Sequence, residues 1–427
     1  MVFVTVGAAG QAPSAAPAAT ADRPVASTPG PSDVTADRVL SDVSRLRELR
    51  ILRAVPSGLK SRDDIRAMVL HDMAEHTTPA KMRTTSRMLE FLGLVDAGFS
   101  LEREAVSLLT EQIAGFYDPR TRFFYLADWI PIDEQRAIMA HELTHALTDQ
   151  HYDLKRFEDW PDGDSDAELA ARALVEGDAT ALMIEYSLDQ RGAPYDLSRI
   201  PVSLTEILRA GASTADAEHP AYAGAPEVLK QNLQFPYVYG AGFVQALLRS
   251  GSWTRVDDAY RSLPVSTEQV IHPDKYLSGD RPAPVAITDV SRRLGPGWHR
   301  VDSDVNGEFG YYLILRDVLD EKVSSKAAAG WGGDRYGFYS DAKGENFTLL
   351  QASVWDSTGD AQEFFEAYAR RIELKYGLAP ATQYTVSAID WKTDIGTVRI
   401  ERSGSRVVIV EGYRGDDVRS LTAAFLP

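Results

Sequence analysis

Two histidines set four residues apart on a predicted helix constrain the fold of this chain more than any other feature. Residues 140–146 read AHELTHA, and the surrounding apolar pattern predicts a helix over residues 133–150. Residues four apart lie one turn above each other on one helix face. His141 and His145 can therefore offer two imidazole nitrogens to a single metal ion, with Glu142 beside it in the position of a general base. The fold has to bury this helix and bring a third ligand to it.

The sequence offers two candidates for that third ligand, and the first is His151. It lies six residues after His145, which is the spacing of the HExxHxxGxxH zinc peptidases. In those proteins a glycine allows the chain to turn sharply, so that the third histidine reaches back to the metal. Here Thr148 occupies the glycine position, and a β-branched residue tolerates such a turn poorly.

The second and preferred candidate is Glu176, on a helix predicted over residues 165–191. This helix is rich in Ala and Leu and should be buried, so a carboxylate in its middle must be paired or bound to a metal. Arg172, one turn earlier, is the alternative partner. Gly177 costs the helix about 1 kcal/mol relative to Ala, which predicts the close approach of another element there. Ser165 and Glu168 read as a capping box at the start of the helix.

Charge and composition narrow the classes of function. The 427 residues contain 45 Lys and Arg and 62 Asp and Glu, a net charge of −17, which argues against nucleic acid and anionic membranes as partners. There is no cysteine, so His, Asp and Glu must hold any metal. No apolar run reaches the roughly 18 residues that span a bilayer, and we expect no stable membrane insertion. The oligomeric state stays open.

The order of sequence patterns predicts an α+β fold in three parts. Residues 1–34 read as a disordered leader that contains a truncated signal peptide, which predicts export of the chain. Residues 35–300 read as a helical region followed by a catalytic domain, with helical patterns at 203–210, 226–232 and 238–262. A type I turn at 118–121 and an aromatic strand at 122–126 predict a short sheet or hairpin before the histidine helix. Residues 301–427 read as a separate α+β domain, with one helix near 309–329.

These motifs together resemble the gluzincin class of zinc metallopeptidases. HELTHALTDQHYDL followed by ARALVEGDAT carries the resemblance, and GFYDPRTRFFYL and STEQVIHPDKYL make the chain similar to a group of largely uncharacterised bacterial metallopeptidases. The resemblance covers residues 101–280. It implies a zincin-like core, one Zn²⁺ held by His141, His145 and Glu176, Glu142 as general base, and a peptide or protein substrate. One departure concerns the Asp that thermolysin-like enzymes carry one turn after the third ligand: Thr180 stands there.

Further residues are candidates for binding the substrate and stabilising the oxyanion. Tyr237, Tyr239 and His272 are candidate oxyanion donors, and we select Tyr239 and His272 as catalytic residues. The aromatic run 123–125 is a candidate sheet edge for an extended peptide. The absence of a GxMxN-like exopeptidase signature favours an endopeptidase. Two other interpretations stay open: a non-catalytic binding or scaffold protein that keeps the metal site, and a zinc hydrolase that cleaves a different bond.

Overall fold

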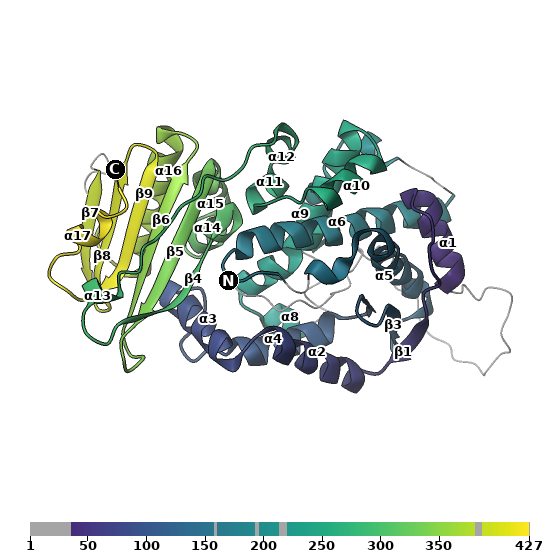
Figure 1. The fold of residues 1–427 in the computed structure, drawn as a ribbon, viewed down its shortest axis with the longest axis horizontal. Coiled ribbons are helices and arrows are strands. Elements are labelled where there is room, and N and C mark those ends of the chain that lie inside the picture. Colours follow the sequence, from purple (N-terminus) through teal and green to yellow (C-terminus); the bar gives the residue numbers. More distant parts are fainter. Residues whose placement is uncertain (1–35, 158–159, 193–195, 213–219, 381–386, 427) are drawn as a thin grey trace.

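The computed structural model describes residues 36–157, 160–192, 196–212, 220–380 and 387–426. The predicted leader and signal peptide lie outside these ranges. The fold is mixed α+β, as predicted, with a helical N-terminal region that contains a small sheet and a C-terminal region built on a larger antiparallel sheet. Figure 1 shows the large sheet at one end of the molecule and the helical region at the other.

Four helices and a three-stranded sheet form the first part of the chain. Apolar residues at helical spacing form the helices α1 (Ala36–Arg47), α2 (Arg62–His76), α3 (Pro79–Leu92) and α4 (Leu101–Gln112). The sheet has the order β1-β3-β2, with β1 (Ser57–Lys60) parallel to β3 (Phe123–Ala127) and β2 (Gly115–Asp118) antiparallel to it. The predicted hairpin before the histidine helix is therefore confirmed. The sequence patterns did not predict β1.

The prediction that residues 123–125 form a free sheet edge is wrong. These residues lie in β3, the central strand of the small sheet, where β1 and β2 pair with both of its sides. The reason is the unpredicted strand β1, which covers the side that the hairpin alone would leave open. A peptide cannot add to this sheet along β3, because both rows of backbone groups are already paired.

Three long helices form the centre of the molecule: α5 (Ile132–Tyr152), α6 (Ser165–Gln190) and α9 (Glu227–Ser250). A Cβ atom built on Gly177 of α6 would lie 2.2 Å from the backbone carbon of Gly240 in α9. The close approach predicted at Gly177 is thus confirmed, and two facing glycines allow it. The predicted capping box is displaced by one residue, because Asp164, not Ser165, caps α6 by accepting a hydrogen bond from Ala167 N at 3.0 Å.

The remaining helices of this region are short and surround the three long ones. Helix α9 runs without interruption through Pro236, so the segments 226–232 and the start of 238–262 form one helix. The others are η1 (Leu154–Phe157), η2 (Leu197–Arg199), α7 (Leu204–Ala212), α8 (Pro220–Gly224), α10 (Trp253–Arg261), α11 (Thr267–Ile271), α12 (Pro273–Ser278) and α13 (Ser291–Leu294). None of the described helices is long and apolar enough to cross a membrane.

The C-terminal region is a six-stranded antiparallel sheet with helices packed on it. The strand order is β4-β5-β6-β9-β8-β7, and the strands are β4 (His299–Asp304), β5 (Trp331–Ser340), β6 (Phe347–Trp355), β7 (Ala388–Thr393), β8 (Gly396–Ser403) and β9 (Arg406–Tyr413). The helices are α14 (Gly307–Arg316), α15 (Glu321–Ala328), α16 (Thr358–Lys375) and α17 (Arg419–Thr422). The single helix predicted over 309–329 is split in two, since Asp320 caps a new helix by accepting from Val323 N at 2.9 Å.

Polar contacts fix the large sheet region to the helical region. Arg371 of α16 is fully buried and donates to the backbone oxygens of Ile314 (2.9 Å) and Leu92, the last residue of α3. Its partner carboxylate is the buried Glu411 of β9. Loss of Glu411 would leave the charge of this buried guanidinium without its carboxylate, and loss of either backbone oxygen would leave a buried donor unpaired. Figure 1 shows α14 and α15 between the sheet and the helical region.

Candidate metal centre

Three side-chain atoms from α5 and α6 converge on one point. His141 Nε2 and His145 Nε2 lie 3.1 Å apart, and Glu176 Oε2 lies 3.2 Å from the first and 3.3 Å from the second. Within the described residues, these three side chains are the group whose geometry could hold a metal ion. The two helices face each other along this line, so ligands that are 35 residues apart in the sequence meet.

The triangle of ligand atoms has the dimensions that a tetrahedral ion requires. Zinc binds His nitrogen and carboxylate oxygen at about 2.0–2.2 Å, which places neighbouring tetrahedral ligands about 3.3–3.5 Å apart. The three observed separations of 3.1–3.3 Å are close to that edge length. The donor set of two imidazoles and one carboxylate is also one that zinc accepts. The residues therefore fit a zinc ion with one position left for water or substrate.

Glu176 faces the histidines and not its predicted alternative partner. Arg172 donates to Glu168 at 2.9 Å, one turn earlier on α6. The Glu176 side chain is 14% exposed, while those of His141 and His145 are 1% and 8% exposed. The carboxylate in the middle of this helix is thus paired with imidazoles in a largely dry environment, as the Ala- and Leu-rich sequence predicted.

Charge coupling within the triangle shifts the pKa values of its members. Burial would raise the pKa of Glu176, but His145 and His141 beside it lower that pKa to about 2. Burial would lower the pKa of His145, but the carboxylates of Glu176 and Glu142 raise it to about 9. The coupling therefore favours the protonated form of His145 and the ionised form of Glu176, and a metal ion bound here would compete with the proton on His145.

Glu142 is held by the small sheet and has one free oxygen. The backbone N–H of Tyr117 in β2 donates to Glu142 Oε2 at 2.8 Å. The other oxygen, Oε1, is buried and has no hydrogen-bond partner within the described structure. Burial raises the pKa of Glu142 above its usual value, although the nearby histidines oppose the shift. This geometry suits a carboxylate that accepts a proton from a water at Oε1.

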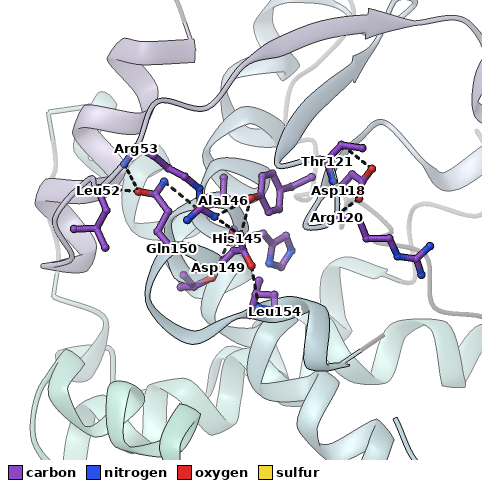
Figure 2. A network of polar contacts seen from close by, with 12 residues as sticks. Leu52, Arg53, Asp118, Arg120, Thr121, His145, Ala146, Asp149, Gln150 and Leu154 are labelled. Carbon is purple, nitrogen blue, oxygen red and sulfur yellow. Dashed lines mark hydrogen bonds and ion pairs between the residues drawn. The ribbon is translucent and has the colours of Figure 1, made fainter. Parts of the chain in front are cut away.

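A polar cluster at the end of α5 supports this arrangement. Asp149 accepts hydrogen bonds from the Tyr117 hydroxyl (2.8 Å) and the Leu154 N–H (3.0 Å), and it forms an ion pair with Arg53. The same tyrosine thus binds Asp149 through its hydroxyl and Glu142 through its backbone. In the view of Figure 2, Arg53 lies on one side of His145 and the turn that contains Asp118 lies on the other. Sequence reasoning missed this cluster.

A second buried cluster lies behind the ligand helix α6. Asp178 is fully buried and accepts from Arg47 Nε at 2.8 Å and from the Tyr260 hydroxyl at 3.0 Å. Arg47 comes from α1, so the first helix of the described chain closes this side of the site. The Nδ1 atoms of both ligand histidines are buried without a hydrogen-bond partner in the described structure. Among the described residues, no carboxylate therefore accepts a hydrogen bond from the Nδ1 atom of either histidine. Asp178 is bonded to Arg47 and Tyr260 instead.

The rival ligand His151 points away from the triangle. Helix α5 continues to Tyr152, and His151 Nε2 lies 2.8 Å from the backbone oxygen of Arg50. The reason is that α5 runs through Thr148 without interruption, so the chain does not turn back towards the histidines there. Of the two candidates, Glu176 is the one that meets both histidines.

The three candidate oxyanion donors have different surroundings. The Tyr237 ring stacks on that of His141 with 5.9 Å between centroids. Tyr239 packs on Phe235 at 4.9 Å, and burial raises the pKa of its hydroxyl. His272 lies between α11 and α12 and bonds to Glu308 of α14 through Nε2 at 2.9 Å. Among these contacts, only that of Tyr237 reaches a residue of the triangle; Tyr239 and His272 stay predictions.

Comparison with known proteins gives one match. A family model described as a domain of unknown function (DUF8575) matches residues 292–422, which contain the six-stranded sheet. No curated protein and no solved structure matches the chain. The match lies outside the helices α5 and α6, so the interpretation of the metal centre depends on its own geometry.

Proposed function

We propose that this chain is a zinc-dependent peptidase in which His141, His145 and Glu176 hold one zinc ion and Glu142 is the general base. The observation that carries the proposal is the triangle of ligand atoms 3.1–3.3 Å apart, with the Glu142 carboxylate on the same helix. A structural zinc site would have four protein ligands, whereas three ligands leave a position for water or substrate. An open position beside a buried carboxylate is an arrangement for hydrolysis.

Zinc bound in this site would lower the pKa of a water towards about 7 and polarise a substrate carbonyl. Glu142 would accept the proton of the attacking water at Oε1, the oxygen without a hydrogen-bond partner in the described structure. It would then transfer that proton to the leaving amine. The hydrogen bond from Tyr117 N–H at 2.8 Å keeps the carboxylate oriented while the proton moves.

A donor for the oxyanion would complete the site. We include Tyr239 and His272, predicted from the sequence, and Tyr237, whose ring lies against His141. Single variants separate them: Tyr237→Phe, Tyr239→Phe and His272→Ala each remove one donor. Loss of a donor of this kind lowers kcat by about 10²- to 10³-fold and leaves zinc content unchanged.

Endopeptidase activity and export of the chain belong to the same proposal. Export depends on the segment 1–34, which lies outside the described residues. In the non-catalytic alternative, Glu142 has no role as a base. In the other alternative, Glu142 is still the base but the cleaved bond is not a peptide bond.

The test combines zinc analysis with turnover of a peptide library. We expect about one zinc per chain, and cleavage within peptides that stops in Glu142→Gln. The matched control is Glu134→Gln, which removes an exposed carboxylate from the first turn of the same helix and should keep full activity. Zinc binding without any Glu142-dependent cleavage would refute the peptidase and favour a binding protein.

A further inference from the structure

A groove with a volume of about 900 Å³ lies at the C-terminal end of α5, the helix that also carries His141 and His145. This is the size of a site for a large ligand. Its lining brings together the β2–β3 turn, the end of α5, η1 and the end of α10. We call it the basic groove, because six cationic side chains line it: Arg53, Arg120, Arg122, Lys155, Arg156 and Arg261.

Half of these cations already have carboxylate partners. The pairs are Arg53–Asp149, Arg120–Glu75 and Arg261–Asp258. Their charge is largely compensated, and they contribute mainly to the shape of the groove walls.

The other three cations have no carboxylate partner in the described parts of the chain. Arg122 and Lys155 are exposed and form no ion pair there. Arg156 donates to the backbone oxygen of Tyr260 at 2.5 Å and lies over the Phe157 ring, 4.7 Å from its centroid. These contacts orient the Arg156 guanidinium, and no carboxylate among the described residues pairs with it. Apart from Asp149, which Arg53 neutralises, Asp153 is the acidic side chain of the lining.

Such a concentration of positive charge is unusual for this chain. The net charge is −17, so most of the surface repels an acidic ligand, while the basic groove attracts one locally. Beyond a Debye length of about 8 Å in physiological salt, the rest of the surface has little influence on a short ligand. A long polyanion would meet the whole acidic surface, which disfavours nucleic acid.

The aromatic side chains of the groove also argue against nucleic acid. Tyr152 and Tyr260 both line it, but their rings stack on each other with 4.6 Å between centroids and 5° between planes. Sequence-tolerant binding of single strands uses free aromatic faces on which bases stack. Neither tyrosine presents an unstacked ring to a base, whereas the separate cations of the lining can each pair with a carboxylate.

The basic groove and the metal centre lie on the same helix, α5, and hydrogen bonds join their residues. Asp149 lines the groove and follows His145 by one helical turn. It accepts from the Tyr117 hydroxyl at 2.8 Å, and the backbone of the same tyrosine binds Glu142. The groove therefore begins about 6 Å along the helix axis from His145, a distance that two residues of an extended peptide span.

We propose that the basic groove binds acidic side chains of a polypeptide substrate, so that the enzyme prefers substrates with Asp or Glu to one side of the cleaved bond. This inference rests on the proposed peptidase function and adds the substrate class. Arg122, Lys155 and Arg156 are the specificity-determining residues.

The test measures peptide binding to the full-length, zinc-loaded protein carrying Glu142→Gln, which prevents turnover. The probes are two fluorescein-labelled twelve-residue peptides that differ only in four Glu-to-Gln replacements, followed by fluorescence anisotropy. We expect the acidic peptide to bind at least about 10-fold more tightly than the neutral one. Adding Arg122→Gln and Lys155→Gln should weaken the acidic peptide about 5- to 10-fold and the neutral peptide less than about 2-fold, as expected for two exposed charge pairs.

The matched control removes one exposed Arg and one exposed Lys elsewhere, with Arg83→Gln and Lys343→Gln, and should leave both affinities within about 2-fold. Equal binding of the two peptides, or equal effects of groove and control variants, would overturn the inference. So would a single-stranded oligonucleotide that binds through Arg122 and Lys155 when the acidic peptide does not. If the groove variant fails to fold, the same binding is measured at two salt concentrations on the protein without groove substitutions. Raising the salt from 50 mM to 500 mM should lower the affinity of the acidic peptide and leave that of the neutral peptide unchanged.

Failure of this inference differs from failure of the proposed function. Zinc content and Glu142-dependent cleavage without a preference for acidic peptides would overturn the substrate class alone. Groove-dependent binding of acidic peptides without cleavage would support the groove and refute the peptidase.

Discussion

The substitution Gly177→Ala tests how tightly α6 has to approach α9 to place the third ligand. An added Cβ would lie 2.2 Å from the carbon, 2.3 Å from the oxygen and 2.7 Å from the Cα of Gly240. All three are backbone atoms, which cannot rotate away as a side chain can. The two helices would have to separate by about 1 Å or more to restore an ordinary contact.

Two opposing contributions set the size of the effect. Alanine favours a helix over glycine by about 0.5–1 kcal/mol. Overpacking of a well-packed interior costs about 1–3 kcal/mol. Since the clash is with backbone, we expect the upper part of that range, and a net loss of about 1–2 kcal/mol in the free energy of unfolding. Glu176 is the adjacent residue, so its carboxylate shifts and zinc affinity should fall about 10- to 100-fold.

Urea unfolding of the zinc-loaded protein and a competitive zinc titration measure the two effects. The control is Gly224→Ala in α8, where an added Cβ meets nothing within 4 Å; it should change stability by less than about 1 kcal/mol and leave zinc affinity unchanged. A Gly177→Ala protein as stable as the wild type, with unchanged zinc affinity, would refute the argument that this close approach sets the ligand geometry.

Three further predictions concern the base, the protonation of the site and the cluster behind it. Glu142→Gln should keep zinc, measured by metal analysis, and lower the rate of peptide cleavage about 10²- to 10⁴-fold, because it removes the general base. For His145, whose pKa is raised to about 9, the stabilisation of the zinc-free protein should be complete below pH 6.5 and lost as the pH rises through 9. For Glu176, whose pKa is lowered to about 2, stabilisation should be present above pH 4.5 and lost as the pH falls through 2. Thermal melts should therefore show a zinc-induced increase in Tm that grows from pH 6 to pH 8.5. Arg47→Met should lower the free energy of unfolding by about 3–5 kcal/mol, measured in urea, because it leaves buried Asp178 without its cation.

Matched variants control for general effects in these experiments. Arg38→Met removes an exposed arginine from the same helix as Arg47 and should cost less than about 0.5 kcal/mol. For the pH series, the control is Glu176→Gln. In this variant the zinc-induced increase in Tm should rise much less between pH 6 and pH 8.5 than in the wild type. A zinc effect that is equally large in this variant would show that the metal binds elsewhere.

The three residues of the candidate metal centre could be predicted because helical spacing converts sequence distance into geometry. His141 and His145 are four residues apart and therefore share one face of a helix. Glu176 lies in an apolar helix that should be buried, and a buried carboxylate has to be ion-paired or bound to a metal. Gly177 gave a further signal, a cost to the helix that only a close neighbour explains. The fold class and the hairpin before α5 followed from periodicity and turn residues in the same way.

The supporting contacts could not be predicted, because they join distant segments or use backbone atoms. The donor to Glu142 is the backbone N–H of Tyr117, a group that every non-proline residue has. Arg47 and Asp178 are 131 residues apart, and nothing local in the sequence pairs them. Strand β1 has only four residues and depends on β3 for its pairing. The cap Asp164 is adjacent to the predicted cap Ser165, and either side chain is suited to that role.

The most direct test of the central claim is the position of zinc relative to Glu176. A crystal structure of the zinc-loaded protein, with anomalous data at the zinc edge, should show one ion bonded to Nε2 of His141, Nε2 of His145 and a Glu176 oxygen at about 2.0–2.2 Å. Zinc bound by His151 in place of Glu176, or no ion at this site in saturating zinc, would contradict the account.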